Sequence, residues 1–156
     1  MFKSLENQWK EVNNVIGIIL ATHADLGQEL IQAITLILGK QSNLKAIGLK
    51  HGDSIETFEQ KLLALFDEID TGDGVLGFCD FLGGTPANTL MRCMKKKYFP
   101  CITGVNMPML IEALTNRESI SVEELKDRCI IIGTNSILSL KNVIEEAEQQ
   151  NTEEEF

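Results

Sequence analysis

The sequence is poor in the residues that mark metal sites and disulfide frameworks. It has two histidines, and its four cysteines include no Cys-x-x-Cys pair. Residues so scattered give no metal-ligand spacing, so we expect no zinc site. The cysteines fall mostly in apolar segments, which is typical of reduced, buried thiols in a cytosolic protein.

Positive charge is also scarce. The 156 residues carry 14 Lys and Arg against 23 Asp and Glu, a formal net charge of −9. This balance argues against direct binding to nucleic acid or to an anionic membrane. No apolar run approaches the ~18 residues of a membrane-spanning helix, and no signal peptide opens the chain. Length and a hydrophobic content of 44% predict one soluble domain with a sizeable core.

Familiar nucleotide and hydrolase motifs are missing. The chain contains neither a phosphate-binding G-x-x-x-x-G-K-[ST] loop nor a G-x-S-x-G nucleophile elbow. The segment Gly72-Asp-Gly74-Val-Leu-Gly77 does match G-x-G-x-x-G. It leads into an expected strand instead of following one, so we reject a dinucleotide site there.

An apolar run that stops at a histidine organises the chain. Residues 15–20 are bulky and uncharged, as in a strand buried on both faces, and the strand ends at His23. From Asp25 the apolar residues recur at helical spacing as far as Gly39, a plausible C-cap. Further strands are expected at 44–49, 75–79 and 100–105. Strands that alternate with helices in this way predict a doubly wound α/β sheet.

Capping residues predict where the other helices lie. Asp53 or Ser54 begins a helix that runs to about Glu68, and Thr85 caps one whose first residue is Pro86. Asn106 begins a helix that runs to about residue 116. Ser121 and Glu124 form a capping box for a helix that runs to about residue 132, and Gly133-Thr-Asn135 breaks the helical pattern.

Both ends of the chain are harder to interpret. Residues 1–14 show the apolar spacing of a short amphipathic helix. Ser136–Leu140 fits either a fifth short strand or a further helical turn, and the pattern leaves both open. The acidic, polar stretch 145–156 is expected to fray in solvent.

Candidate functional groups gather at the ends of expected strands. His23 follows the first strand and Asp80 the third, and Gly83-Gly84-Thr85-Pro86 opens the next helix. If the third strand lies beside the first, both side chains meet in the crevice where strand order reverses. A carboxylate bound to one imidazole nitrogen makes the other a nucleophile, and a helix N-terminus suits a phosphoryl group. His51 has no such partner, and we interpret it as a surface loop residue.

At these residues the chain resembles the enzyme IIA component of the mannose family of the phosphoenolpyruvate-dependent sugar phosphotransferase system. The resemblance covers about Val15 to Lys141. It rests on three blocks in order: Gly-Ile-Ile-Leu-Ala-Thr-His23, Gly77-Phe-Cys-Asp80-Phe-Leu-Gly-Gly-Thr85-Pro-Ala-Asn88 and Ile102-Thr-Gly-Val-Asn106-Met-Pro-Met-Leu110.

The resemblance implies a cytoplasmic phosphotransferase with a phosphohistidine intermediate. His23 would take a phosphoryl group on Nε2 from HPr and pass it to enzyme IIB, which serves the membrane components IIC and IID. Asp80 would hold Nδ1, and Gly83, Gly84 and Thr85 would bind the phosphoryl oxygens, with no metal or other cofactor. Leu26, Phe81 and Leu82 are either docking residues for these partners or core residues.

The resemblance also implies an architecture. Three α/β/α layers would surround four parallel strands in the order 2-1-3-4, with an antiparallel edge strand exchanged in a homodimer. That favours a strand at Ser136–Leu140. Residues 15–141 would form the enzyme IIA domain, 1–14 an N-terminal extension and 142–156 an acidic tail.

Two rival functions share this pattern. One is the phosphotransferase subunit of a dihydroxyacetone kinase, which has a similar fold and histidine; Gly83-Gly-Thr-Pro-Ala-Asn88 looks more like the sugar-transport branch. The other is a regulatory binding module that is never phosphorylated.

Overall fold

The computed structural model describes residues 14–153, with side chains through 149. Its centre is a four-stranded parallel sheet in the order β2-β1-β3-β4, as expected. The strands are β1 (Gly17–His23), β2 (Leu44–Leu49), β3 (Val75–Cys79) and β4 (Cys101–Thr103). The helix expected near the N-terminus falls on residues 1–13, outside the described residues.

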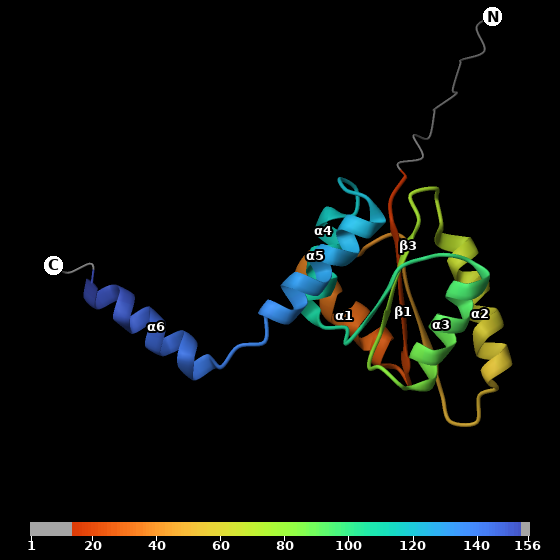
Figure 1. The fold of residues 1–156 in the computed structure, drawn as a ribbon, viewed down its shortest axis with the longest axis horizontal. Coiled ribbons are helices and arrows are strands. Elements are labelled where there is room, and N and C mark those ends of the chain that lie inside the picture. Colours follow the sequence, from red (N-terminus) through yellow and green to blue (C-terminus); the bar gives the residue numbers. More distant parts are fainter. Residues whose placement is uncertain (1–13, 154–156) are drawn as a thin grey trace, which may run out of the picture.

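Helices cover both faces of the sheet and complete three layers (Figure 1). One face packs on α1 (Leu26–Leu38), α4 (Met107–Asn116) and α5 (Val122–Asn135). The other packs on α2 (Ile55–Ile69) and α3 (Thr85–Lys96). The central strand β1 alternates its side chains between these two cores: Ile18 and Leu20 face one, Ile19 and Ala21 the other. Because both faces are covered, β1 is apolar from Gly17 to Ala21, and the buried hydroxyl of Thr22 accepts the N–H of Gly27 at 2.9 Å.

The helix starts agree with the capping signals apart from one residue. Ser54, Asn106 and Ser121 are N-caps whose side chains accept a backbone N–H of the first turn. The helix α3 begins at Thr85 with Gly84 as N-cap, so the expectation that Thr85 caps it is wrong by one position. Pro86 still lies in the first turn, where no intrahelical donor is needed.

The break expected at Gly133 does not occur, because α5 continues to Asn135. A Cβ placed on Gly133 would lie 2.4 Å from side-chain atoms of Met109 on α4. The glycine therefore permits close packing of α5 on α4, and its carbonyl accepts the side-chain amide of Asn106 at 3.3 Å.

The strand favoured for Ser136–Leu140 is not formed within this chain. Ser136 is in a turn, residues 137–139 have no regular structure, and Leu140 begins the helix α6 (Leu140–Glu153). An edge strand needs a neighbouring strand for its backbone hydrogen bonds, and this segment leads away from the sheet (Figure 1). The expected fraying is also wrong for residues 145–153, which belong to α6, while residues 154–156 lie outside the described residues.

None of the described helices is both long and apolar enough to cross a membrane.

Candidate functional site

The predicted pair meets where β1 and β3 end. The Nδ1 atom of His23 lies 2.7 Å from Oδ2 of Asp80. The same oxygen accepts the backbone N–H of His23 at 2.9 Å. The two strands are adjacent and parallel, so their carboxyl ends coincide at one edge of the sheet. The structure thus brings together the two residues that the sequence places at strand ends.

The carboxylate of Asp80 is largely shielded from solvent and accepts hydrogen bonds at both oxygens. Its Oδ1 atom accepts the backbone N–H of Phe81 at 3.0 Å, and the side chain is 9% exposed. Burial raises the pKa of Asp80, but the hydrogen bonds from His23 and Phe81 outweigh it and the pKa is lowered overall. An ionised carboxylate only accepts hydrogen bonds, so Nδ1 of His23 carries the ring proton.

This tautomer leaves the Nε2 lone pair of His23 free to react. The His23 side chain is 40% exposed, far more than its carboxylate partner. An imidazole held by one nitrogen and open at the other is the arrangement that nucleophilic catalysis needs.

The glycine turn expected to bind a phosphoryl group packs directly on His23. A Cβ placed on Gly84 would lie 2.7 Å from Cε1 of the imidazole. Gly83 has φ +89°, a backbone conformation that few residues other than glycine adopt. No side chain caps α3, so the free N–H groups of its first turn remain available close to the ring. Thr85 is the first residue of that turn.

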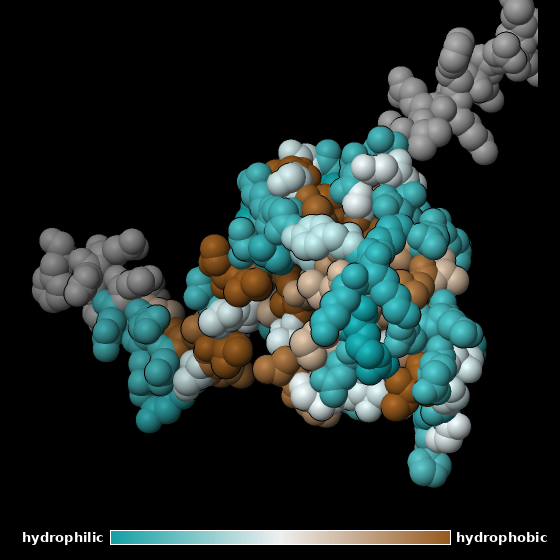
Figure 2. All heavy atoms as spheres, turned by 45° about the vertical axis from the view of Figure 1, so that its right-hand side comes forward, coloured by the Kyte–Doolittle hydropathy of each residue, from teal (hydrophilic) through white to brown (hydrophobic). Residues whose placement is uncertain are grey.

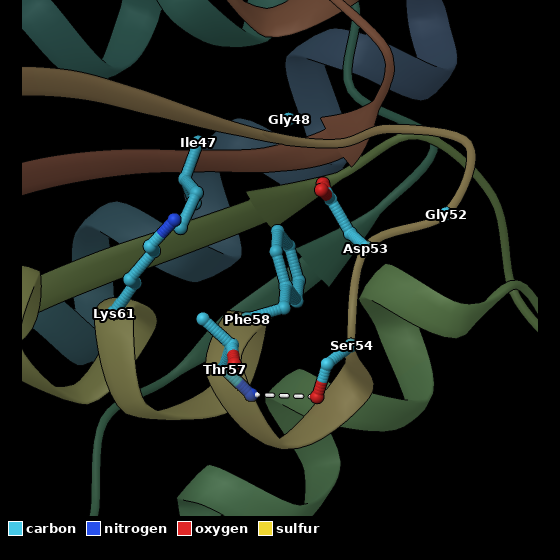
Figure 3. A pocket seen from close by; sticks show the side chains of 8 residues that line it. All are labelled: Ile47, Gly48, Gly52, Asp53, Ser54, Thr57, Phe58 and Lys61. Carbon is cyan, nitrogen blue, oxygen red and sulfur yellow. Dashed lines mark hydrogen bonds between the residues drawn. The ribbon is translucent and has the colours of Figure 1, made fainter.

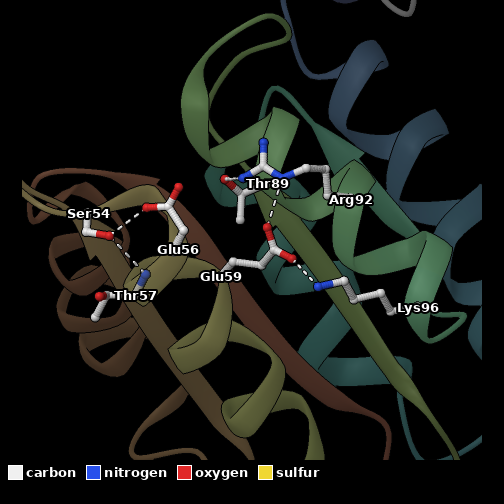
Figure 4. Close-up of polar contacts among 7 residues, drawn as sticks. All are labelled: Ser54, Glu56, Thr57, Glu59, Thr89, Arg92 and Lys96. Carbon is white, nitrogen blue, oxygen red and sulfur yellow. Dashed lines mark hydrogen bonds and ion pairs between the residues drawn. The ribbon is translucent and has the colours of Figure 1, made fainter.

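Ion pairs join α2 to the C-terminal half of α3 (Figure 4). Glu59 on α2 accepts from Nε of Arg92 at 2.8 Å and from Nζ of Lys96 at 2.6 Å. These bonds, led by the one from Lys96, lower the pKa of Glu59. The Arg92 guanidinium also donates to Thr89 at 3.1 Å. One carboxylate therefore links two turns of α3 to the neighbouring helix.

The strand β2 supports the turn that follows His23, and no pattern in the sequence predicts this support. After His23 the chain turns through Ala24, whose φ of +48° is uncommon for a residue with a Cβ. The Ala24 N–H donates to the carbonyl of Leu49 at 2.9 Å. A Cβ on Gly48 would lie only 1.7 Å from the Ala24 oxygen, so the turn requires glycine there. Nothing in the sequence around Gly48 distinguishes it from other strand glycines.

The apolar rim, defined as Leu26, Phe81 and Leu82, surrounds the site. Their exposed fractions are 46%, 54% and 71%, so the core-packing alternative is wrong for all three. The ring of Phe81 stacks on that of His23, with centroids 5.0 Å apart and planes inclined by 12°. No pattern in the sequence indicates this stack.

His51 is exposed in the loop after β2, as expected. A hollow of about 180 Å³ lies beyond that loop (Figure 3), and neither His23 nor Asp80 lines it. Ser54 borders the hollow, but its hydroxyl accepts the N–H of Thr57 at the start of α2. We assign no chemistry to this hollow.

Within residues 14–153, no group of three or more histidine, cysteine or acidic side chains is placed to hold a metal ion. All four cysteines are free, as expected, and three are buried. Burial raises the pKa of Cys93 to about 11 and that of Cys129 to about 12, so these thiols stay protonated.

Comparison with known proteins shows clear similarities. The family model EIIA-man, described as PTS system fructose IIA component, matches residues 17–130. The mannose-specific EIIAB component of Escherichia coli K12 is 34% identical over 128 residues, which are 81% of this chain and 40% of that protein. The chain thus spans about two fifths of that relative's length. The fructose-specific EIIA component of Bacillus subtilis is 30% identical, over 71% of this chain and 77% of that one.

Solved structures of phosphotransferase system IIA proteins are also similar to this chain. The phosphotransferase system component EIIA from Streptococcus agalactiae has a TM-score of 0.76 at 25% identity, and the alignment covers 81% of this chain and 98% of that one. The mannose/sorbose-specific IIA subunit from Enterococcus faecalis has a TM-score of 0.72 at 25% identity, over 81% and 95% of the two chains.

The lowered pKa of Asp80 leads to a testable pH dependence. A carboxyl group whose pKa is lowered by folding stabilises the protein above its ordinary pKa of 3.8, and this contribution is lost as the pH falls through the folded-state pKa. We therefore expect the wild type to lose more unfolding free energy than Asp80→Asn between neutral pH and about pH 3. Urea titrations across this range measure the difference. Equal losses in the two proteins would contradict it.

Proposed function

Since the chain belongs to the EIIA-man family of phosphotransferase system IIA components, we propose that it is a phosphocarrier that uses His23. The histidine would accept a phosphoryl group from phospho-HPr and pass it to enzyme IIB. The observation that carries this proposal is the 2.7 Å contact between Nδ1 of His23 and Asp80, which leaves Nε2 as the exposed nucleophile.

Each transfer would be a displacement at phosphorus between two imidazoles. The Nε2 lone pair of His23 forms the new N–P bond as the N–P bond to the HPr histidine breaks, and that electron pair returns to the HPr nitrogen. Asp80 keeps the Nδ1 proton in place throughout. Transfer to enzyme IIB repeats the step with His23 as the leaving group. Positioning and charge stabilisation suffice for such chemistry, so neither nucleotide nor metal is required.

The turn that follows Asp80 would hold the transferred group. Gly83 and Gly84 lack side chains where the phosphoryl oxygens would lie, and Gly84 already contacts the His23 ring. The first amides of α3 and the positive end of its dipole would bind those oxygens, with the Thr85 hydroxyl as a further donor.

HPr and enzyme IIB would dock in turn on the apolar rim. Exposed leucine and phenylalanine side chains around a nucleophile suit small, transient interfaces of about 1,200 Å² or less. By family membership the chain would serve sugar uptake, with the membrane components IIC and IID downstream of enzyme IIB. It would then work in the cytoplasm, next to the transporter. The names of the matched relatives favour this role over service to a dihydroxyacetone kinase.

We also propose a homodimer, in which each copy lends its C-terminal segment to the other. Sixteen large hydrophobic side chains are exposed in the described part of the chain, and eight of them lie within residues 130–144. Figure 2 shows hydrophobic side chains gathered where the C-terminal arm, defined as residues 136–153, leaves the body. Residues 136–140 of a second copy would pair with the free edge of β4. The side chains of Ile137 and Leu138 would point to opposite faces of the added strand, so one of them would lie over the apolar hollow between β4 and α3, which Leu90, Met91 and Met94 line.

The central test is the intact mass after incubation with phosphoenolpyruvate, enzyme I and HPr. The wild type is expected to gain one acid-labile phosphoryl group, and His23→Ala none. His51→Ala, which removes the other histidine, serves as the matched control and should gain the group normally. If the wild type gained nothing while HPr became phosphorylated, the phosphocarrier role would be refuted and a regulatory binding module would become the leading alternative.

Docking on the rim predicts that Leu82→Ser slows phosphorylation by phospho-HPr. Loss of one exposed leucine contact is expected to reduce the rate about tenfold at low HPr concentration. Leu36→Ser is the control, because Leu36 is 90% exposed on α1 away from the rim. Stopped-flow or quenched assays measure both rates. Equal rates for the two variants would argue against docking through Leu82.

The exchanged dimer predicts that charge in the C-terminal arm separates the subunits. Light scattering should give the wild type twice the chain mass of 17.4 kDa, and the double variant Ile137→Glu, Leu138→Glu the mass of one chain. Leu36→Glu, at a more exposed position outside the arm, should remain dimeric. A wild type that is monomeric at high concentration would refute the exchange.

A further inference from the structure

We propose that Phe81 is a positioning residue for His23, whose stacked ring fixes the plane of the imidazole so that Nε2 stays aimed outward. This role rests on the proposed phosphocarrier function. It is separate from any part that Phe81 plays in docking, because it concerns the orientation of the nucleophile before a partner arrives.

Contacts on three sides define the orientation of the His23 ring. Asp80 binds the Nδ1 edge at 2.7 Å. Phe81 covers one face, with nearly parallel planes. The backbone of Gly84 approaches both rings, since a Cβ there would lie 2.7 Å from His23 Cε1 and 3.0 Å from Phe81 Cζ. None of these three contacts covers the Nε2 edge or the second face of the imidazole.

If Asp80 alone held the His23 ring, the ring could still rotate about its Cβ–Cγ bond. The stack on Phe81 restricts this rotation. Torsion about the Cβ–Cγ bond of histidine is broad, so a single bond at Nδ1 tolerates a considerable tilt of the ring. The Nε2 lone pair lies in the ring plane, and a displacement at phosphorus needs that lone pair in line with the leaving group. Alignment within about 10–20° is the usual requirement for a productive site. A flat ring against one face restricts this tilt.

The exposure of Phe81 indicates that burial in the core does not force its ring against His23. The side chain is 54% exposed, so the hydrophobic core does not impose its orientation. Its backbone N–H donates to Oδ1 of Asp80, so one residue secures the carboxylate and covers the imidazole. The stack also suits the phosphorylated state. A ring with a proton on Nδ1 and a phosphoryl group on Nε2 carries positive charge, which the face of an aromatic ring attracts.

A small phosphoryl donor separates positioning from docking. Phosphoramidate transfers its phosphoryl group to histidine without any protein surface, so residues that only dock HPr do not affect its rate. We expect Phe81→Leu to slow phosphorylation of His23 by phosphoramidate about two- to tenfold. Phe81→Tyr keeps the ring and is expected to restore the rate. Tyr98→Leu is the matched control: it removes another exposed ring, beyond the far end of α3, and should match the wild type.

Two outcomes with phosphoramidate would overturn the proposal. If Phe81→Leu reacted as fast as the wild type, the stack would have no part in positioning. If Phe81→Tyr were as slow as Phe81→Leu, the presence of an aromatic ring would not be what matters. Thermal unfolding of all variants checks that a slow reaction does not reflect a lost fold.

NMR relaxation of the His23 ring in the unphosphorylated protein gives a readout that does not depend on phosphoryl transfer. In the wild type and Phe81→Tyr, the Cδ2–H and Cε1–H bonds of the His23 ring should be as rigid as the backbone around them. In Phe81→Leu the order parameters of these bonds should fall, and unchanged values would overturn the proposal. A wild type that accepts nothing from phospho-HPr would refute the phosphocarrier role, while these spectra would still decide whether Phe81 orders the ring.

Discussion

The double hydrogen bond between Asp80 and His23 is the constraint on which the rest of the site depends. One carboxylate oxygen accepts both the backbone N–H and the ring Nδ1 of the same histidine. The first bond fixes where the residue leaves β1, and the second fixes which ring nitrogen is free. Both bonds need β1 and β3 to be neighbours and to end at the same level, which the parallel register between them ensures. The position of the His23 ring is therefore set by the sheet.

The surrounding elements secure this arrangement without enclosing it. On one side β2 supplies Gly48, without which the Ala24 carbonyl could not lie over the strand. On the other side Glu59 ties α3 to α2, so the helix whose N-terminus faces His23 is held by charged contacts well away from the reacting atoms. The groups near the imidazole are accordingly small or flat: two glycines and the ring of Phe81. Larger side chains there would occupy the space that a phosphoryl group needs.

Much of the fold and of the candidate site could be predicted from the sequence, because both depend on local sequence patterns. Apolar runs gave the strands, capping residues gave the helix starts, and a histidine and an aspartate after two strands gave the site. The predictions that were wrong, and the contacts that were not predicted, depend on residues far apart in the sequence. Gly133 looked like a helix break because glycine has a low helix propensity, whereas its real role depends on Met109, which belongs to another helix. The stack of Phe81 and the support from Gly48 are likewise tertiary contacts that no local pattern records. The segment 136–140 is a further case, since a strand at a sheet edge requires hydrogen-bonding partners that this segment does not have within its own chain.

The exposure of His23 fits a nucleophile that reacts only with other proteins. A small substrate would be enclosed in a pocket, yet the histidine is 40% exposed while its carboxylate is 9% exposed. Two different partners would have to reach the same nitrogen, so the chain itself cannot cover it. A phosphohistidine must nevertheless be shielded from water during transfer, and each docked partner would supply that shield by covering the apolar rim. The ring would then have to be held by Asp80, Gly84 and Phe81, because a docked partner would cover its outer side. In an open site of this kind, the chain's own fold would orient the histidine, and the docked partner would shield the phosphohistidine from water.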